Sequence, residues 1–210
     1  MPRTITLSGH GETRMVPDLA FVTSGVLSQG ATAAEALSVN TKTMNSLFAA
    51  LKDAGIAEKN IQTSSFSVQP RYDFNNGTAP PKLVGYEVSN TVTVTVHKLA
   101  DLGPLLDSLV SAGSNQIQGI GFQVSEPNAA LDAARQLAAA DATRKAKVYA
   151  AAMGVDLGKV VSISEGGVQQ PQPPLLRSGP MMADAASAPV PVAAGEQALS
   201  IDVTVTWEIR

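Results

Sequence analysis

Two stretches of this sequence alternate strictly between apolar and polar residues, and they constrain the fold more than any other feature. The first is "NTVTVTVH" at 90–97, and the second is "IDVTVTWEIR" at 201–210. A period of two is typical of a β-strand with one buried and one solvent-exposed face. Because a strand needs a hydrogen-bonding neighbour, we expect the C-terminal stretch to pair with "VVSIS" at 160–164.

Further strand patterns occur along the chain, and most of them are arranged as hairpins. Residues 4–9 and 19–28 flank the turn signal Pro17-Asp18, so we expect these two strands to pair with each other. Residues 61–74 alternate as well, and Pro70 indicates a sheet edge or a bulge there, because proline cannot donate to a strand ladder.

A phase change marks one more strand, "QIQGIGFQVSE" at 116–126. Ile117 belongs to one register, whereas Ile120 and Phe122 belong to the other. This shift predicts a β-bulge at one of the two glycines between them, Gly119 or Gly121.

Three helices separate these strands. The first, over 32–55, begins with Thr32 and Glu35 at the spacing of a capping box, the second covers 101–113, and the third is the alanine-rich stretch 127–154. The faces that we expect to be buried are Leu37, Met44, Leu47, Phe48 and Leu51 in the first helix, Leu102, Leu105, Leu106, Leu109 and Val110 in the second, and Leu131, Leu137, Ala138 and Val148 in the third.

The resulting order, β-β-α-β-β-α-β-α-β-β, favours the α+β class. We expect an antiparallel or mixed sheet built from β-hairpins, with the helices packed on one face. Hydrophobic residues make up 44% of the 210 residues and charged residues 16%, so the chain can bury a core. We expect a single domain over 1–210, with an excursion rich in proline and alanine at about 169–196 between the last two strands.

Composition excludes several classes of function. The formal net charge is −3 and no run of Lys or Arg could neutralise a row of phosphates, so nucleic acid is not an expected partner. Cysteine is absent, which excludes disulfides, thiolate metal sites and a cysteine nucleophile. No apolar run approaches the roughly 20 residues of a transmembrane helix, and no signal peptide stands in this chain.

The stretch "LSGHGETRMVPD" at 7–18 could be a phosphate-binding glycine loop or a strand that packs closely through its glycines. A phosphate loop leads into a helix N-terminus, whose free N–H groups face the anion. This stretch leads into a turn and another strand instead. We therefore interpret Gly9 and Gly11 as sites of close backbone packing or strand bending.

No catalytic constellation is visible in the sequence. His10 and His97 are the only histidines, neither lies in a zinc-binding spacing, and there is no nucleophile elbow of the type GxSxG. Tyr86 and Trp207 fit strand positions facing a core, and the doublet Met181-Met182 is weak evidence for copper. We predict no catalytic, cofactor-binding or metal-binding residues.

Apolar residues within the excursion predict a different kind of site. A segment that exposes apolar side chains can dock on a partner subunit. The candidate oligomer contacts are Leu175, Leu176, Met181 and Met182.

Four blocks of sequence together resemble the SIMPL-domain family. The opening "ITLSGHGETRMVPDLAFV" is similar to the family's first strand, Pro-Asp turn and second strand. "NTVTVTVHKLADLGPLLDSLVSAGSNQIQGIGFQVSEP" is similar to its central block, and "AARQLAAADATRKAKVYAAAMGVDLGKVVSISEGG" to its alanine-rich helix and following strand. The final "VTVTWEI" fits the closing strand. The resemblance covers nearly the whole chain outside the excursion.

The resemblance implies a bacterial periplasmic protein whose signal peptide has been removed. Bacterial members are mostly exported, one is an immunogenic periplasmic protein, and some are linked to defence against oxidative stress. At least one forms a hollow, channel-like ring, and the family has no agreed catalytic residues.

Three functions remain open from the sequence. The first is a non-enzymatic periplasmic homo-oligomer, ring- or channel-like, with a role in cell-envelope or oxidative-stress defence and a contact with the envelope. The second is a detoxifying enzyme that depends on a small molecule or metal and brings His10, His97 and carboxylates into one pocket. The third is an envelope- or peptide-binding module that uses an unpaired, uncharged sheet edge.

Overall fold

The structure is a computed structural model that describes residues 3–74, 81–167 and 190–210. The described elements are the strands β1 (Thr4–Met15), β2 (Leu19–Gly30), β3 (Ile61–Asp73), β4 (Lys82–Val96), β5 (Gln116–Gln123), β6 (Leu157–Glu165) and β7 (Gln197–Ile209), and the helices α1 (Ala33–Asp53), α2 (Leu102–Ser111) and α3 (Asn128–Met153). Short 3₁₀-helices lie at Glu58–Asn60 and Leu99–Asp101. The element order and the α+β class are those expected from the sequence.

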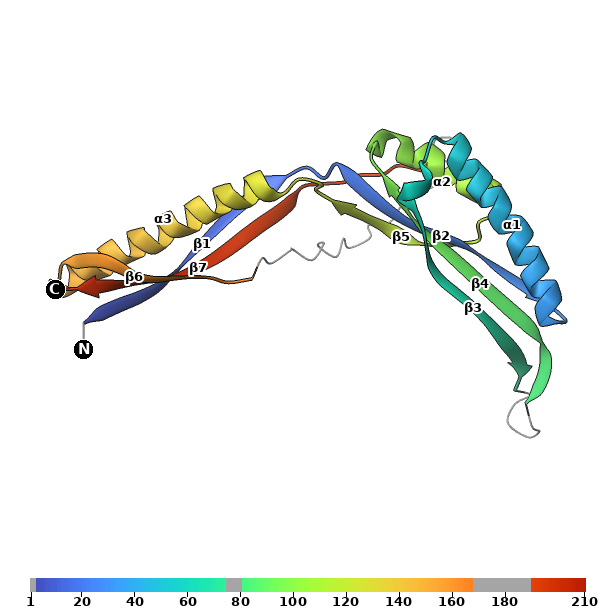
Figure 1. Cartoon of the computed structure of the whole chain (residues 1–210), viewed down its shortest axis with the longest axis horizontal. Coiled ribbons are helices and arrows are strands. Elements are labelled where there is room, and N and C mark those ends of the chain that lie inside the picture. The colour runs from blue at the N-terminus through green and yellow to red at the C-terminus, as the bar shows by residue number, and fades with distance from the viewer. Residues whose placement is uncertain (1–2, 75–80, 168–189) are drawn as a thin grey trace, which may run out of the picture. The chain divides into compact units, whose positions relative to one another are not determined.

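The described residues form two compact units, each with its own antiparallel sheet. The first unit contains residues up to Pro17, 124–167 and the C-terminal residues from Gly195. Its strand order is β1-β7-β6, and α3 lies along this sheet (Figure 1). The expected pairing of β6 with β7 is confirmed, with Ile163 opposite Val205.

The expected hairpin between β1 and β2 is wrong. β1 pairs antiparallel with β7 over its full length, from Thr4 opposite Glu208 to Met15 opposite Gln197. β2 belongs to the second unit, where it pairs with β4 and β5. The signal at Pro17-Asp18 marks the point where the chain passes from one unit to the other.

Glycine and alanine bring α3 close to the sheet of the first unit. A Cβ atom added at Gly9 would collide with the backbone of Ala138 and Ala142, and one added at Gly11 with the backbone of Ala134. The buried stripe of α3 is a row of alanines at every fourth position: Ala134, Ala138, Ala142, Ala146 and Ala150. Close packing is thus the role of the two glycines in "GHG".

The predicted buried face of α3 is only partly correct. Leu131 and Ala138 are buried, but Leu137 and Val148 lie off the alanine stripe and are 50% and 58% exposed. The reason is the close approach of α3, because only side chains as small as alanine fit between the helix and the two glycines.

The second unit contains Asp18–Gln123 and residues 190–194. Its strand order is β3-β4-β2-β5, with α1 and α2 on one face of the sheet (Figure 1). The core between the helices and the sheet includes Leu47 and Leu51 of α1, Leu109 of α2, and Val92 and Val94 of β4. The expected burial of three other helix residues is wrong: Leu37, Phe48 and Val110 are 41%, 38% and 56% exposed.

A buried amide also joins α1 to this sheet. Asn40 is 1% exposed, and its Nδ2 donates to the carbonyl oxygens of Val26 and Val88 at 2.9 and 3.2 Å. The two carbonyls belong to neighbouring strands. The amide therefore fixes the position of α1 across β2 and β4.

The helix boundaries follow local sequence signals. Thr32 and Glu35 form the expected capping box at the start of α1. Gly55 and Gly154, with φ of 78° and 63°, follow the ends of α1 and α3 in the left-handed conformation that glycine favours. By contrast, Asp101 at the start of α2 makes no capping hydrogen bond.

Most of the excursion at 169–196 lies outside the described residues. Its last part is described, and Val192 packs against the core of the second unit. The neighbouring Val190 lines an apolar hollow of about 330 Å³ between α2 and β5.

Candidate functional site

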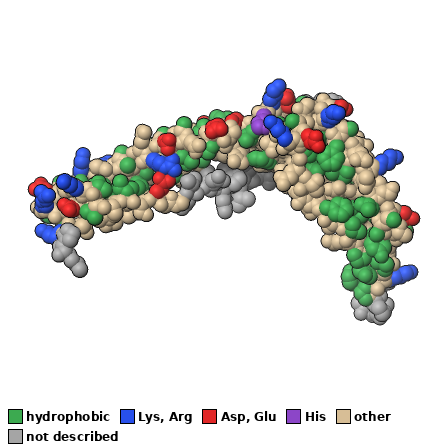
Figure 2. All heavy atoms as spheres, in the orientation of Figure 1, with side chains coloured by type: hydrophobic (Ala, Val, Ile, Leu, Met, Phe, Trp, Pro, Cys, Tyr) green, Lys and Arg blue, Asp and Glu red, His purple; other side chains and the backbone are tan. Residues whose placement is uncertain are grey.

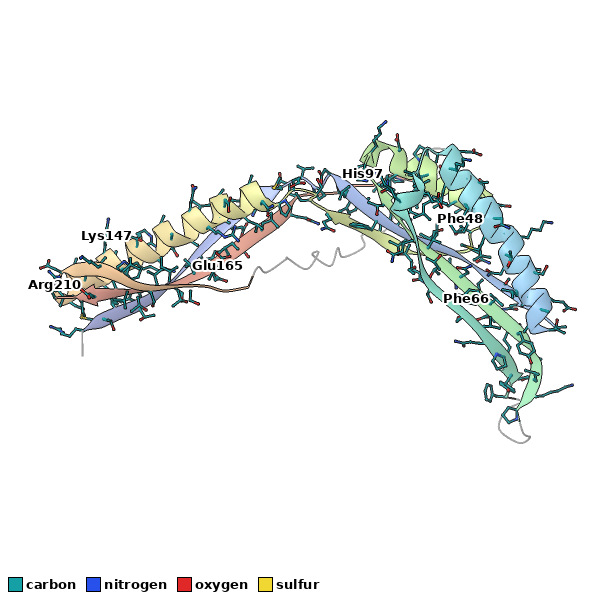
Figure 3. All side chains as sticks on the ribbon, in the orientation of Figure 1. Phe48, Phe66, His97, Lys147, Glu165 and Arg210 are labelled. Atoms are coloured by element: carbon teal, nitrogen blue, oxygen red, sulfur yellow. The ribbon has the colours of Figure 1, made fainter. Side chains whose placement is uncertain are left out.

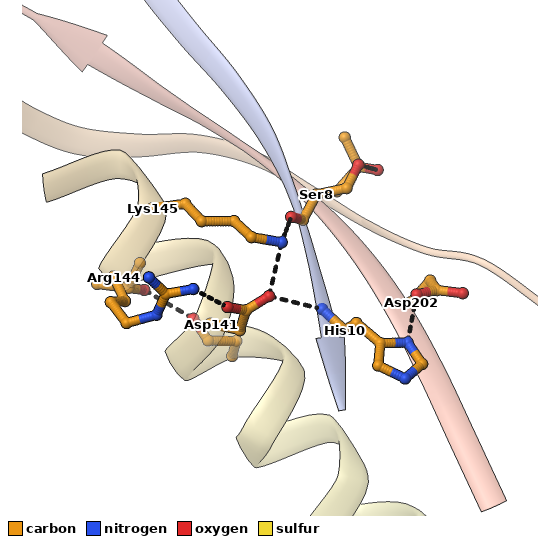
Figure 4. Close-up of polar contacts among 9 residues, drawn as sticks. Ser8, His10, Asp141, Arg144, Lys145 and Asp202 are labelled. Atoms are coloured by element: carbon orange, nitrogen blue, oxygen red, sulfur yellow. Dashed lines mark hydrogen bonds and ion pairs between the residues drawn. The ribbon is translucent and has the colours of Figure 1, made fainter. Parts of the chain in front are cut away.

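A cluster of charged side chains on the first unit holds α3 to β1 (Figure 4). Asp141 of α3 accepts hydrogen bonds from Lys145 at 2.7 Å, from Arg144 at 2.6 Å and from the backbone N–H of His10 at 3.1 Å. Lys145 Nζ also donates to the carbonyl oxygen of Ser8 at 2.9 Å. One ion pair thus binds a backbone donor and a backbone acceptor on the outer edge of β1.

Three donors around Asp141 hold the pKa of its carboxyl group well below its ordinary value of 3.8. The hydrogen bond from Lys145 is the largest cause, followed by those from the His10 backbone and from Arg144. Asp141 therefore stays ionised at all but strongly acidic pH. The site is a charged structural contact, because its carboxylate is already occupied by partners of the same chain.

The face of β1 and β7 that points away from α3 contains serine, histidine and aspartate, but their arrangement is not that of a catalytic triad. His10 Nδ1 lies 2.9 Å from Asp202 Oδ1. The Ser8 hydroxyl, however, bonds to Thr204 Oγ1 at 3.0 Å rather than to the histidine. These residues form successive cross-strand pairs on an exposed face of the sheet, where about half of each His10 and Asp202 side chain is accessible.

His97 belongs to the other unit, directly after β4, and it borders a hollow of about 440 Å³ (Figure 3). Lys98, Asp101, Asn60 and Ser108 contribute to the lining. The pocket that the enzyme hypothesis requires has to combine His10 with His97, and neither unit by itself contains both. Within the described ranges, no group of three or more His, Asp or Glu side chains could hold a metal ion.

Of the two aromatic residues expected to face a core, Trp207 does so. Trp207 is 4% exposed and lies in the core beneath α3, as expected from its position in the alternating strand. Tyr86 is partly buried opposite Gly30 of β2.

A second ion pair on the first unit was not expected from the sequence. Arg135 of α3 binds both carboxylate oxygens of Glu165, at 2.9 and 3.0 Å, and also reaches Asp132 at 2.8 Å. The hydrogen bonds from Arg135 lower the pKa of Glu165. Glu165 is the last residue of β6, so the pair ties the end of that strand to α3. The spacing of Arg135 and Asp132 was visible in the sequence, whereas the contact with Glu165 depends on the fold.

Exposed apolar side chains occur on both units, and on the second unit a group of them lies over the hairpin of β3 and β4 (Figure 2). Figure 3 shows Phe48 on α1 and Phe66 on β3. The exposed large apolar residues of the hairpin are Phe66, Val68, Tyr72, Leu83 and Val84, and Phe74 follows directly after β3. Surface of this kind is typical of a site that binds another molecule.

The apolar residues predicted as oligomer contacts, Leu175, Leu176, Met181 and Met182, lie outside the described residues. The part of the chain that the structure describes has no helix long and apolar enough to cross a membrane.

Comparison with known proteins shows similarity over nearly the whole chain. A family model described as "SIMPL: Protein of unknown function (DUF541)" matches residues 5–207. The 26 kDa periplasmic immunogenic protein of Brucella melitensis is 38% identical over 215 residues, an alignment that covers 100% of this chain and 86% of the relative.

Two further relatives carry the name "Uncharacterized protein YggE". The one from Escherichia coli strain K12 is 32% identical over 91% of this chain and 75% of its own length. The one from Edwardsiella ictaluri is 33% identical over 77% of this chain and 67% of its own length. None of the three is named as an enzyme. The family match and these identities show that the chain belongs to the SIMPL family.

Proposed function

We propose that this SIMPL protein is a non-enzymatic periplasmic protein that assembles into a homo-oligomer, ring- or channel-like, and protects the cell envelope, including against oxidative stress. The observation that carries the proposal is the exposed apolar surface of the β3 and β4 hairpin, where Phe66 is 54% and Phe74 68% exposed. A second copy that covered this surface would remove it from water, at a gain of roughly 25 cal/mol per Å².

The polar clusters support a function without catalysis. His10, Asp202 and Ser8 are engaged in cross-strand pairs, and Asp141 is engaged with Lys145 and β1. An activated nucleophile is hydrogen-bonded to its base, whereas the Ser8 hydroxyl bonds to Thr204 and not to His10. These polar groups are used instead to hold strands and helices together.

The periplasmic location is supported by the name of the Brucella relative. Cell fractionation of the source organism tests it, and recovery of the protein with the cytoplasmic fraction would contradict it.

For the stress role, a strain without the gene should survive peroxide less well than its parent, and equal survival of the two strains would argue against that role.

We also propose that Leu175, Leu176, Met181 and Met182 contribute to the contacts between copies, because their segment is rich in apolar residues. Replacing all four with serine should weaken assembly, as measured by the concentration at which copies dissociate. An unchanged concentration would remove these residues from the contact.

Light scattering coupled to size exclusion tests the assembly itself. We expect a mass several times the 21.7 kDa of one chain. A strictly monomeric protein at micromolar concentration would contradict the proposal.

A second candidate function is a module that binds an extended peptide of the cell envelope. The observation that favours it is the edge strand β3, which is uncharged from Ile61 to Pro70. An added strand can bind such an edge through backbone hydrogen bonds. A monomeric protein that binds envelope peptides would support this function over assembly.

A further inference from the structure

The hollow beside His97 has the size of a small-molecule site. Its volume is about 440 Å³, whereas such sites occupy roughly 300–1,000 Å³. It lies where α1 ends and where β4 passes into α2, and Figure 3 labels His97 at this end of β4. All of its lining residues belong to Asp18–Gln123, so the second unit forms the hollow by itself.

The lining of the hollow combines an apolar base with a polar rim. Val96 of β4 and Leu105 of α2 are buried in the core of the unit, and Ile56 packs against the same core, so these three form the base. The polar lining residues are Asn60, His97, Lys98, Asp101 and Ser108. An apolar surface with a few convergent polar groups is the usual composition of a site for a small organic molecule.

Two opposite charges at the rim, Lys98 and Asp101, are held close together without pairing. The backbone N–H of Asp101 donates to the carbonyl oxygen of Lys98 at 3.0 Å, so the two residues belong to one 3₁₀ turn. Side chains three residues apart in such a turn lie on the same side of it. In the described part of the chain, however, neither side chain has a hydrogen-bond or ion-pair partner.

Opposite charges at the same spacing do pair on α3. Arg135 binds Asp132 at 2.8 Å, and Arg144 binds Asp141 at 2.6 Å. At the hollow, by contrast, the ammonium group of Lys98 and the carboxylate three residues later both stay available to a ligand.

These two charges restrict the class of ligand. An anion would face the carboxylate of Asp101, and a metal ion would face the ammonium group of Lys98, so either would bring like charges together. A neutral sugar would cover both charges without supplying an opposite charge to either, which is costly. A ligand that carries one anionic and one cationic group satisfies both.

We propose that this hollow binds a free α-amino acid with an apolar side chain. Lys98 donates to the carboxylate of the ligand, Asp101 accepts from its ammonium group, and its side chain lies against the apolar base formed with Leu105. The two charged groups of an α-amino acid are attached to one carbon, which suits two opposite charges held within a single turn. Asn60 and His97 can supply further hydrogen bonds.

This site goes beyond the function proposed above and does not depend on self-association, because one unit of one chain forms it. The binding involves no reaction.

Isothermal titration calorimetry of the full chain with L-leucine tests the site, and two analogues separate its charges. 4-Methylpentanoate lacks the ammonium group of leucine, and 3-methylbutylamine lacks its carboxylate. We expect leucine to bind about tenfold or more tightly than either analogue, because each analogue loses a hydrogen bond between charged groups. No binding of leucine, or equal binding of leucine and its analogues, would overturn the proposal.

Variants that remove one charge assign the two roles. In Lys98→Gln, leucine should bind no more tightly than 3-methylbutylamine, because the carboxylate no longer has a partner. In Asp101→Asn, leucine should bind no more tightly than 4-methylpentanoate. A general loss of structure would not remove one preference and keep the other. A preference for leucine over 3-methylbutylamine that survives in Lys98→Gln would overturn the assignment of its carboxylate.

Lys42→Gln is the matched control for these variants, because Lys42 is exposed on α1 and does not line the hollow. It should leave the affinities for leucine and both analogues unchanged. Circular dichroism confirms that each variant is folded.

The headgroup of phosphatidylethanolamine carries the same two kinds of charge and is the other source of such a ligand. Glycerophosphoethanolamine, which has this headgroup without acyl chains, is therefore titrated in parallel. Leucine should bind more tightly, because glycerol cannot cover the apolar base of the hollow. Tighter binding of glycerophosphoethanolamine would overturn the assignment of an amino acid.

Discussion

Gly9 faces α3 where the helix backbone leaves no room for a side chain. Replacing Gly9 with alanine should lower the free energy of unfolding by about 1–3 kcal/mol, because the added methyl group forces apart α3 and β1. Urea denaturation followed by circular dichroism measures the change.

The control for this substitution is Gly121→Ala in β5, because a Cβ atom there meets open space and the backbone is not left-handed. We expect a change of no more than about 0.5 kcal/mol at Gly121. Equal effects at Gly9 and Gly121 would show that close packing is not the reason for the glycine in β1.

The pKa of Asp141 gives stability a pH dependence. Because the folded pKa lies below the ordinary value of 3.8, the ionised group stabilises the fold at higher pH, and this contribution is lost as the pH falls below that value. Asp141→Asn should be less stable than the unsubstituted protein at pH 7, and the difference should shrink on acidification to about pH 3. Thermal denaturation at several pH values measures it.

Comparing Asp141→Asn with the unsubstituted protein isolates the effect of one carboxyl group on stability. Glu165, whose pKa is also lowered, is present in both proteins and affects both curves alike. Asparagine at 141 can still accept the backbone hydrogen bond from His10 through its amide oxygen. A stability difference that stays constant with pH would mean that the charge of Asp141 does not stabilise the fold.

At the level of residues, the sequence predicts roles that depend on a neighbour in the same element. The spacing of Asp141 and Lys145 predicts their ion pair, and the capping box is readable from Thr32 and Glu35. Their contacts with the backbone of β1 could not be predicted, because nothing local indicates which strand α3 will cover. The same limit applies to Asn40, which reaches two strands at once.

For the elements, α1 and α2 offer a matched test of helix capping. Thr32 accepts a hydrogen bond from the backbone N–H of Glu35, whereas Asp101 at the corresponding position of α2 makes no capping bond. Thr32→Ala should therefore cost about 0.5–2 kcal/mol of stability, measured by urea denaturation, and Asp101→Ala much less. A larger loss from Asp101→Ala would contradict this assignment of the caps.

The order and type of the elements could be predicted, but not all of their partners. Period-two and period-3.6 patterns identify the strands and helices, and glycines mark the ends of α1 and α3. The pairing of β1 with β7 was missed because a turn signal at Pro17-Asp18 suggests a near neighbour, while the true partner is at the other end of the chain. The buried face of α3 was partly missed because alanine, not leucine, fits against Gly9.

At the scale of the whole molecule, the proposed contact makes a prediction about salt. The hairpin surface that carries the proposal of assembly exposes apolar side chains such as Phe66, so ionic screening should have little effect on assembly. Raising the salt from about 0.01 M to about 1 M shortens the Debye length from about 30 Å to about 3 Å. The mass from light scattering should stay the same. Dissociation at high salt would indicate a contact made by charged groups instead.

The family and the fold class could be predicted from the sequence, whereas the exposed apolar surface could not. Alternation identifies β3 as a strand but does not say how far α1 extends over it. The exposure of Phe66 and Ile163 depends on how far the helix of each unit covers its sheet, and this coverage is set by tertiary packing. The described residues form two compact units. Two units can belong to one domain or to two, so the expectation of a single domain over 1–210 stays a prediction.

The pairing of the first strand with the last constrains the order in which the protein can form during synthesis. β1 leaves the ribosome before the second unit, whereas its neighbour β7 follows that unit, so the hydroxyls of Thr6 and Thr206 can meet only after β7 is made. The strands and helices of the second unit lie in one continuous stretch, Asp18–Gln123. They can therefore fold before β7 is available to pair with β1. Contacts this distant along a chain form slowly. A nascent chain therefore carries an unpaired β1 throughout translation, with an interval in which it is open to chaperones and to misassociation.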